Sequence, residues 1–169
     1  MMEHITSRSN RWIKLALRLK QKKWRDREGL FLLEGLRGVT DVLSQHVRDA
    51  LCFVEEGRFP DETVEGLVQE GKKLHWLFLS VDEDKMKLLS GTEHGQGILL
   101  ICHKQNHDKK ELLRPLDGYY VVLDSVQDPG NMGTIVRTSA AAGVKGLILT
   151  EGCTDIYAEK VVRSSMGSI

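Results

Sequence analysis

Cysteine, proline and long apolar runs are all scarce in this sequence. It has three cysteines, Cys52, Cys102 and Cys153, and their odd number and wide spacing argue against a disulfide framework. No apolar run reaches membrane-spanning length, and the charges spread through residues 1–29 leave no signal-peptide pattern. We therefore expect a soluble protein of a reducing, cytoplasmic compartment.

The net charge is zero, but the charges are unevenly distributed. Residues 1–37 carry ten Lys and Arg against four Asp and Glu, residues 38–102 carry six against twelve, and residues 103–169 carry eight of each. A basic N-terminal arm on a neutral protein indicates a face that meets a polyanion. Apolar residues make up 41% of the chain, which is enough to build a folded core.

Residues 10–23 have the pattern of an amphipathic helix. Trp12, Leu15, Ala16 and Leu19 recur at the spacing of one helix face. Beside this apolar stripe runs a basic one, at steps of three or four: Arg11, Lys14, Arg18, Lys22 and Arg25. The basic stripe is either a solvated helix face or a set of phosphate contacts, and the pattern alone leaves both interpretations open.

From residue 30 onwards, short apolar runs alternate with helical patterns. The expected strands are 31–34, 50–54, 74–79 and 98–102, and the expected helices are 35–46, 61–69 (capped by Asp61) and 82–89. This alternation predicts βαβ units and a small α/β layer domain. After a polar linker at 103–117, a second unit follows with strands at 119–123 (buried) and 147–150 and helices at 130–142 and 158–163.

The segment from Leu123 to Gly143 carries the chemistry. A strand runs into a tight turn at Pro129 and Gly130, and Asn131 is expected to cap the helix that follows. Its glycines lack the dinucleotide-binding spacing, and Gly95-x-Gly97 precedes a strand instead of following one. The residues alone therefore predict a ligand loop beyond the strand ends of an α/β sheet.

Several other residues have plain structural interpretations. Arg137 alone would be a surface cation, and Glu34 is expected to pair with Arg37 three residues on. Ser165-x-Gly167 is not a hydrolase nucleophile elbow. Cys102, His103 and His107 lie close in sequence, but they lack a second pair at zinc spacing, so we expect no metal.

Three sets of residues resemble a known family. Asp128, Pro129, Asn131, Gly133 and Arg137 are similar to the first signature motif of the SpoU (TrmH-like) RNA 2′-O-ribose methyltransferases, and residues 160–167 are similar to the second. The N-terminal part resembles the substrate-binding domain of the family at these positions: Ser7, Asn10, Arg25, Gly29, Phe31, Glu34, Gly35 and Arg37.

The resemblance implies an α/β fold with an L30e-like RNA substrate-binding domain at 1–105, a linker at 106–117 and the start of a SpoU domain at 118–169. It implies a parallel SPOUT-type sheet with a C-terminal trefoil knot, a homodimer, and methyl transfer from S-adenosylmethionine to a ribose hydroxyl of structured RNA, with ribosomal RNA favoured. The third motif and the knot are not found in this sequence, so we expect an inactive fragment. The alternative is an RNA-binding module whose catalytic half is vestigial or missing.

The resemblance also assigns roles to residues. Arg137 would be catalytic, and because a guanidinium is a poor base it would polarise the hydroxyl and pair with a phosphate, while Asn131 would position the nucleotide. Methyl transfer from a sulfonium needs no metal. The expected cofactor-binding residues are Thr150, Gly152, Ser165 and Gly167. The expected RNA-binding residues are Arg11, Lys14, Arg18, Lys22, Arg25 and Arg37.

Overall fold

The computed structural model describes residues 2–91, 95–105 and 118–169, and it divides into two compact units, residues 1–103 and 104–169. The predicted linker at 106–117 lies outside the described residues, as do His94 and His107. Within the described ranges, every helix is too short or too polar to cross a bilayer.

The first unit is built on a five-stranded mixed sheet. Its strands, in spatial order, are β1 (Glu3–His4), β4 (Leu77–Val81), β3 (Leu51–Glu55), β5 (Ile98–His103) and β2 (Leu30–Glu34). β1, β4 and β3 run parallel, whereas β5 is antiparallel to both β3 and β2. The expected alternation of strands and helices is therefore present, but the sheet is mixed, and the short edge strand β1 was not predicted.

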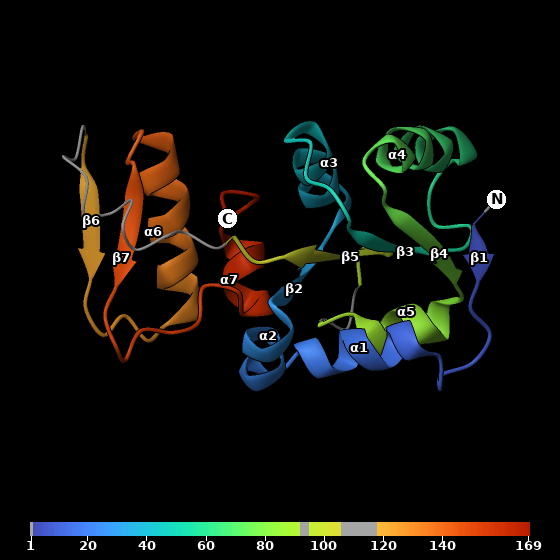
Figure 1. Cartoon of the computed structure of the whole chain (residues 1–169), viewed down its shortest axis with the longest axis horizontal. Helices are drawn as coiled ribbons and strands as arrows, with labels where there is room; N and C mark the ends of the chain where they lie inside the picture. The colour runs from blue at the N-terminus through green and yellow to red at the C-terminus, as the bar shows by residue number, and fades with distance from the viewer. Residues whose placement is uncertain (1, 92–94, 106–117) are drawn as a thin grey trace. The chain divides into compact units, whose positions relative to one another are not determined.

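Helices cover both faces of this sheet (Figure 1). One layer contains α3 (Leu36–Ser44) and α4 (Asp61–Lys73), and the other contains α1 (Arg11–Leu19), α2 (Lys22–Glu28) and α5 (Glu83–Leu89). Beneath the second layer, Ile13, Ala16 and Leu19 of α1 pack against Phe53 of β3 and Leu79 of β4. Phe53 and Leu79 are fully buried, as expected for central strands covered on both sides.

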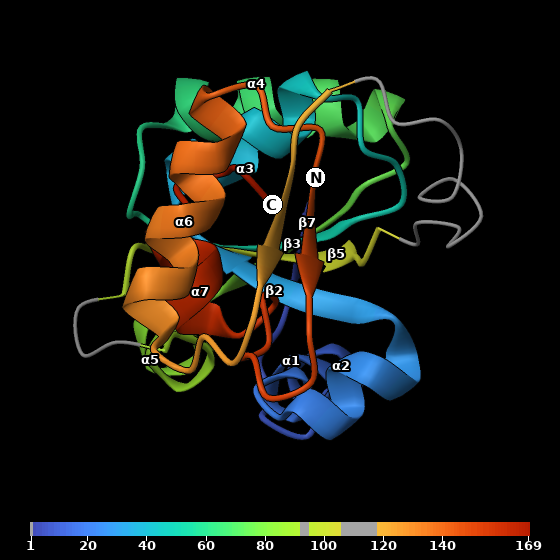
Figure 2. The same cartoon turned by 90° about the vertical axis from the view of Figure 1, so that its left-hand side faces the viewer.

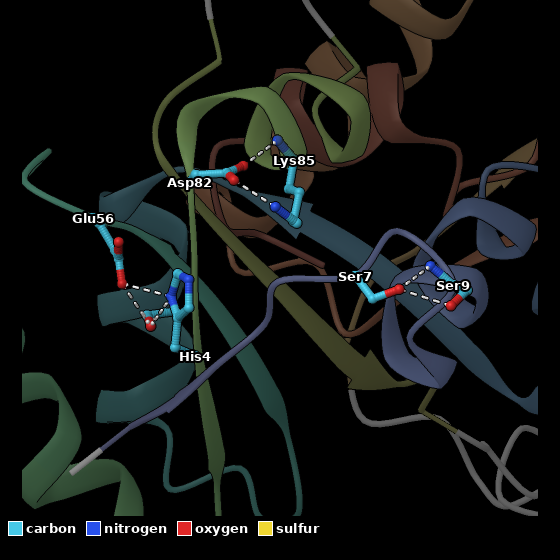
Figure 3. Close-up of polar contacts among 7 residues, drawn as sticks. His4, Ser7, Ser9, Glu56, Asp82 and Lys85 are labelled. Carbon is cyan, nitrogen blue, oxygen red and sulfur yellow. Dashed lines mark hydrogen bonds and ion pairs between the residues drawn. The ribbon is translucent and has the colours of Figure 1, made fainter.

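Two local expectations in this unit are wrong. Residues 10–23 form two helices instead of one, with a break at Lys20 and Gln21, and Asn10 caps the first by accepting a hydrogen bond from the Trp12 amide at 2.8 Å. Asp61 does not cap α4, because Pro60 is the N-cap and Asp61 is the first helical residue. Asp82 caps α5, where its carboxylate accepts from the Lys85 amide at 2.9 Å (Figure 3).

The second unit consists of the parallel strands β6 (Tyr120–Leu123) and β7 (Gly146–Leu149) and the helices α6 (Pro129–Ala141) and α7 (Glu159–Ser164). Figure 2 shows α6 running beside the two strands. Its core contains Leu123, Met132, Val136 and Val161. β6 is less buried than predicted: Val122 is 61% exposed, and Leu123 alone among the residues of this strand is buried.

Candidate ligand site and basic face

The carboxyl ends of β6 and β7 meet at one edge of the second unit, because the two strands are parallel. The Thr150 hydroxyl donates to the Asp124 carboxylate at 2.5 Å, and the Thr150 amide donates to the Leu123 carbonyl at 2.9 Å. Gly152 follows with a φ of +95°, and a Cβ there would lie 3.2 Å from Ser125 Oγ. Backbone groups are therefore close together at the edge where ligands bind in open α/β sheets.

The first turn of α6 begins at this same edge. Asp128, and not Asn131 as predicted, is the N-cap. Its carboxylate accepts a hydrogen bond from the backbone N–H of Asn131 at 2.7 Å. Pro129 stands in the first helical turn, where its missing N–H costs nothing. The exposed side chain of Asn131 takes no part in this capping bond, and so it can face a ligand.

α6 and α7 pack tightly at one glycine. A Cβ built on Gly133 would lie 1.8 Å from Ser164 Oγ and 2.9 Å from the Val161 carbonyl, so only glycine fits. The Ser164 hydroxyl lies 2.8 Å from the Lys160 carbonyl and 3.3 Å from the Pro129 carbonyl at the start of α6. The first and second motifs, separate in sequence, are therefore joined in the fold.

The two motifs also meet at Arg137. Its Nη1 donates to Met166 Sδ at 3.0 Å, across 29 positions of sequence, and both side chains are exposed. Met166 has a φ of +53°, an uncommon value for a residue with a side chain. Among the described residues Arg137 has no carboxylate partner, so its charge remains available for an anion.

The four expected cofactor residues are not equivalent. Thr150 and Gly152 lie at the carboxyl edge, and Gly167, with a φ of +86°, lies after α7. Ser165 is fully buried, its hydroxyl donates to the Val162 carbonyl at 2.7 Å, and its amide donates to the Val161 carbonyl at 2.8 Å. Ser165 therefore has no free donor to offer a ligand.

A cavity of about 460 Å³ also lies in the second unit. Its lining is mostly apolar and comes from residues that include Tyr120, Val136, Leu147, Ile156, Tyr157 and Ile169. Burial raises the pKa of the Tyr157 phenol, and the Lys104 ammonium lies 5.0 Å from the centre of its ring. None of the expected cofactor residues lines this cavity, so the two motifs do not indicate which ligand it would hold.

Five of the six expected RNA-binding residues are exposed, and they lie on three helices. Arg11, Lys14 and Arg18 are exposed along α1, and Lys22 of α2 is exposed but paired with Asp26 at 2.6 Å. Arg37 is exposed on α3, in the layer on the opposite face of the sheet (Figure 1).

The burial of Arg25 contradicts its expected role as an RNA contact. Only 4% of it is exposed, and its Nη1 donates to the Leu19 carbonyl at 2.8 Å and the Lys20 carbonyl at 2.9 Å. Arg25 therefore supplies hydrogen bonds to free carbonyl groups at the carboxyl end of α1, and it is not available to RNA.

Sequence reasoning missed Trp24. Three cationic groups surround its ring: Arg18 Cζ at 4.9 Å, Arg27 Cζ at 5.0 Å and Lys23 Nζ at 5.9 Å. A tryptophan flanked by basic residues just beyond a basic helix was the available signal. The contact to Arg18 depends on the break between α1 and α2, which the helical periodicity did not show.

Other motif residues of the first unit are structural. The hydroxyls of Ser7 and Ser9 lie 2.7 Å apart in the turn before α1 (Figure 3). The Glu34 carboxylate accepts from the Ser90 hydroxyl at 2.6 Å and the Gln96 amide at 3.1 Å. The predicted Glu34–Arg37 ion pair is not formed.

A serine, a histidine and a carboxylate gather at β1, but they do not form a nucleophilic triad. His4 Nδ1 lies 3.1 Å from Ser80 Oγ and 2.7 Å from Glu56 Oε1 (Figure 3). A triad needs the serine on one ring nitrogen and the carboxylate on the other. Here both partners face the same nitrogen, so the group serves to attach β1 to its neighbours.

No cluster of metal-ligating side chains is found within the described ranges. Cys102 is buried, which raises the pKa of its thiol to about 12 and disfavours the thiolate that binds metal.

The fold and the site define a two-unit α/β protein, with a motif-built ligand edge in the second unit and a basic helix pair in the first. Residues 118–169 match the model of the SpoU rRNA methylase family, and residues 10–100 match the MRM3-like substrate binding domain. The chain belongs to the family of SpoU methylases that carry this substrate binding domain, which confirms the resemblance seen in its motifs.

Relatives with this arrangement are named as ribosomal RNA methyltransferases. The chain is 32% identical to the 23S rRNA (guanosine(2553)-2′-O)-methyltransferase RlmP of Bacillus subtilis, over 99% of this chain and 62% of that protein. It is 36% identical to the mitochondrial rRNA methyltransferase 3 of Xenopus tropicalis, over 88% of this chain and 36% of that protein.

A solved structure gives the same relation. The AdoMet-bound rRNA methyltransferase of Sinorhizobium meliloti is 31% identical, with a TM-score of 0.85 over 99% of this chain and 61% of that one. The chain thus spans less than two thirds of the length of each of these three relatives.

Proposed function

We propose that a protein containing this chain transfers a methyl group from S-adenosylmethionine to a ribose 2′-hydroxyl of structured RNA, with ribosomal RNA as the favoured substrate. The observation that carries the proposal is the contact of Arg137 with Met166. It brings an exposed guanidinium of the first motif, carried by the helix that begins at the ligand edge, against the second motif.

Arg137 has two tasks in this proposal. Its planar guanidinium pairs with a phosphate of the target nucleotide, and an N–H of the same group polarises the ribose hydroxyl. A guanidinium stays protonated in proteins, so it does not remove the proton itself. Asn131, exposed in the first turn of α6, offers an amide that can position the nucleotide.

S-adenosylmethionine supplies a methyl group on a sulfonium, so the protein has mainly to align the reacting atoms. Thr150 and Gly152 fit a ligand at the carboxyl edge, where backbone groups are close and Gly152 leaves room that a side chain would fill. Gly167 remains in the proposed set. Ser165 is left out, because its hydroxyl and amide bond within the α7 segment.

We assign residues 1–105 to RNA binding, in an L30e-like domain, and residues 118–169 to the start of a SPOUT-type domain that acts as a homodimer in the cytoplasm. The mixed sheet covered on both faces and the basic helix pair support the first assignment. The match of residues 118–169 to the SpoU family model supports the second.

The test is a methyl-transfer assay with labelled S-adenosylmethionine and ribosomal RNA. It uses the protein that contains this chain, with whatever sequence adjoins residues 1–169 in its gene. A methylated 2′-hydroxyl makes the neighbouring phosphodiester resistant to alkali, which separates ribose from base methylation. Arg137→Gln should lower kcat/KM by about 100-fold or more, as loss of a donor used in the transition state does.

Lys145→Gln is the matched control, because it removes the same charge from the same unit at the other end of β7. Its activity should stay within about twofold of wild type, as expected for an exposed side chain away from the site. Label on a base instead of a ribose would contradict the proposal. Salt-dependent RNA binding with neither transfer nor cofactor affinity would favour an RNA-binding module instead.

A further inference from the structure

We infer that the corner between α1 and α2 is an RNA phosphate-binding site, formed by Arg18, Lys23 and Arg27 around Trp24. We call these four residues the Trp24 cluster. The inference rests on the proposed function, since it assumes an RNA substrate, and it adds where and how the first unit holds that RNA.

The geometry places three cations on one ring. Arg18 Cζ and Arg27 Cζ lie 4.9 Å and 5.0 Å from the centre of the Trp24 ring, and Lys23 Nζ lies 5.9 Å from it. All three cationic groups therefore lie within 5.9 Å of one point, the centre of the Trp24 ring. They can contact phosphate oxygens along one short segment of RNA backbone.

The cluster is short of negative charge. Within the described part of the chain, Arg18 and Lys23 form no ion pair, and Arg27 has one, to Glu28 at 3.6 Å. By contrast, Lys22, next to Lys23 on α2, and Lys73 and Lys87, elsewhere in the first unit, each pair with a carboxylate at 2.6 to 2.7 Å. The positive charges of the cluster repel one another, and a bound polyanion offsets this repulsion.

Trp24 acts as a positioning residue for the two arginines. The ring attracts a cation over its face, which limits the side-chain freedom that Arg18 and Arg27 would otherwise lose on binding. A guanidinium held against an aromatic ring keeps N–H groups at its edge for a phosphate. Trp24 itself is partly exposed, so the cluster lies at the surface.

Arg25 fixes the corner from beneath. Its bonds to the Leu19 and Lys20 carbonyls attach α2 to the end of α1, and this sets where Lys23, Trp24 and Arg27 project. The buried arginine thus supports the exposed ones.

The cluster continues along α1. Lys14 and Arg11 precede Arg18 at steps of four and three, a ridge of about 10 Å, and Arg11 Cζ lies 4.4 Å from the Trp12 ring. A row of cations repeated along a helix suits the repeated phosphates of an RNA backbone.

The first test compares two double variants of the whole chain. R18Q/R27Q removes two charges from the cluster. R48Q/K72Q removes two exposed charges elsewhere in the first unit that form no ion pair with any described residue. Binding to a fluorescein-labelled ribosomal RNA hairpin is followed by anisotropy over a series of KCl concentrations. Circular dichroism checks that both variants stay folded.

We expect R18Q/R27Q to weaken binding about tenfold or more near 0.1 M KCl and to flatten the slope of log K against log [KCl] by about 1.5 to 2. R48Q/K72Q should bind within about twofold of wild type, with an unchanged slope. Equal behaviour of the two variants would overturn the inference. Absence of RNA binding by wild type would instead count against the proposed function.

A second test isolates the ring. Trp24→Leu keeps every charge, so it should weaken binding several-fold with the salt slope unchanged, and Trp24→Phe should restore most of the loss because a ring is present again. Full wild-type affinity in Trp24→Leu would remove the positioning role. Displacement of the RNA by polyglutamate at equal charge concentration would overturn the preference for RNA in favour of a general polyanion site.

Discussion

The two units bury their sheets very differently. In the first, helices cover both faces, and four of the five residues of β3 are buried. In the second, the two strands pack against α6, and no residue of β7 is fully buried. Tyr119, just before β6, is 83% exposed. The unit that carries the basic face therefore has a closed core, whereas the unit that carries the motifs has an open one.

This contrast suggests a division of stability. A two-stranded sheet is marginal without further packing, whereas five strands with helices on both faces support a core of their own. We expect the first unit to open only by global unfolding and the second to open at lower cost. Three pairs of measurements on the two units test this division of stability.

Thiol labelling should show the largest difference. Cys52 and Cys102 are buried in the first unit, and burial raises the pKa of both thiols, so they should react only when that unit unfolds. Cys153 in the second unit is partly exposed. We expect it to react at least about 1,000-fold faster in native protein, since an unfolding cost of 5 kcal/mol or more leaves very little open form. Cys153→Ser should abolish the fast phase. Rapid labelling of Cys102 would contradict the expectation that the first unit opens only by global unfolding.

Truncation of one side chain in each sheet should show the next largest difference. Phe53→Ala opens a cavity in a fully buried site and should lower the free energy of unfolding of the first unit by about 3–5 kcal/mol. Val122→Ala, on the exposed side of β6, should cost less than about 1 kcal/mol in the second unit. Urea denaturation followed by circular dichroism measures both. Similar losses would mean that the second sheet is as tightly covered as the first.

Adding one methyl group to a helical glycine should give the smallest difference, with opposite signs in the two units. Gly133→Ala forces a contact with Ser164 and should destabilise the second unit by about 1–3 kcal/mol. Gly66→Ala in α4 meets nothing within 4 Å, so it should stabilise the first unit by up to about 1 kcal/mol through helix propensity. Urea denaturation followed by circular dichroism measures both changes. A neutral Gly133→Ala would show that α6 and α7 can move apart.

Much of the fold could be predicted from periodicity. The apolar runs at 50–54 and 98–102 became β3 and β5 within a residue, because central strands of a covered sheet are apolar throughout. β1 escaped prediction because two exposed residues have no apolar pattern; their pairing with Leu79 and Ser80 comes from tertiary contact. The directions of the strands also depend on contacts that no local pattern contains.

Sequence motifs predicted which residues form the ligand edge. They did not predict side-chain directions at the breaks and ends of helices. Helical spacing placed Arg25 on the basic stripe, but the break at Lys20 and Gln21 directs it inward against the end of α1. Asp128 and Asn131 are both good caps by residue type, and the preference of proline for the first helical turn, applied to Pro129, would have identified Asp128. The Trp24 cluster spans two helices, so it could be seen only in the fold.

β1, the shortest of the described strands, protects one edge of the five-stranded sheet from other molecules. β1 pairs with Leu79 and Ser80 of β4, and both of its residues, Glu3 and His4, are polar and exposed. Without it, β4 would offer open backbone N–H and C=O groups, the template on which sheets of separate molecules join. Deleting residues 2–4 would therefore be expected to promote self-association at concentrations where the intact chain remains dispersed.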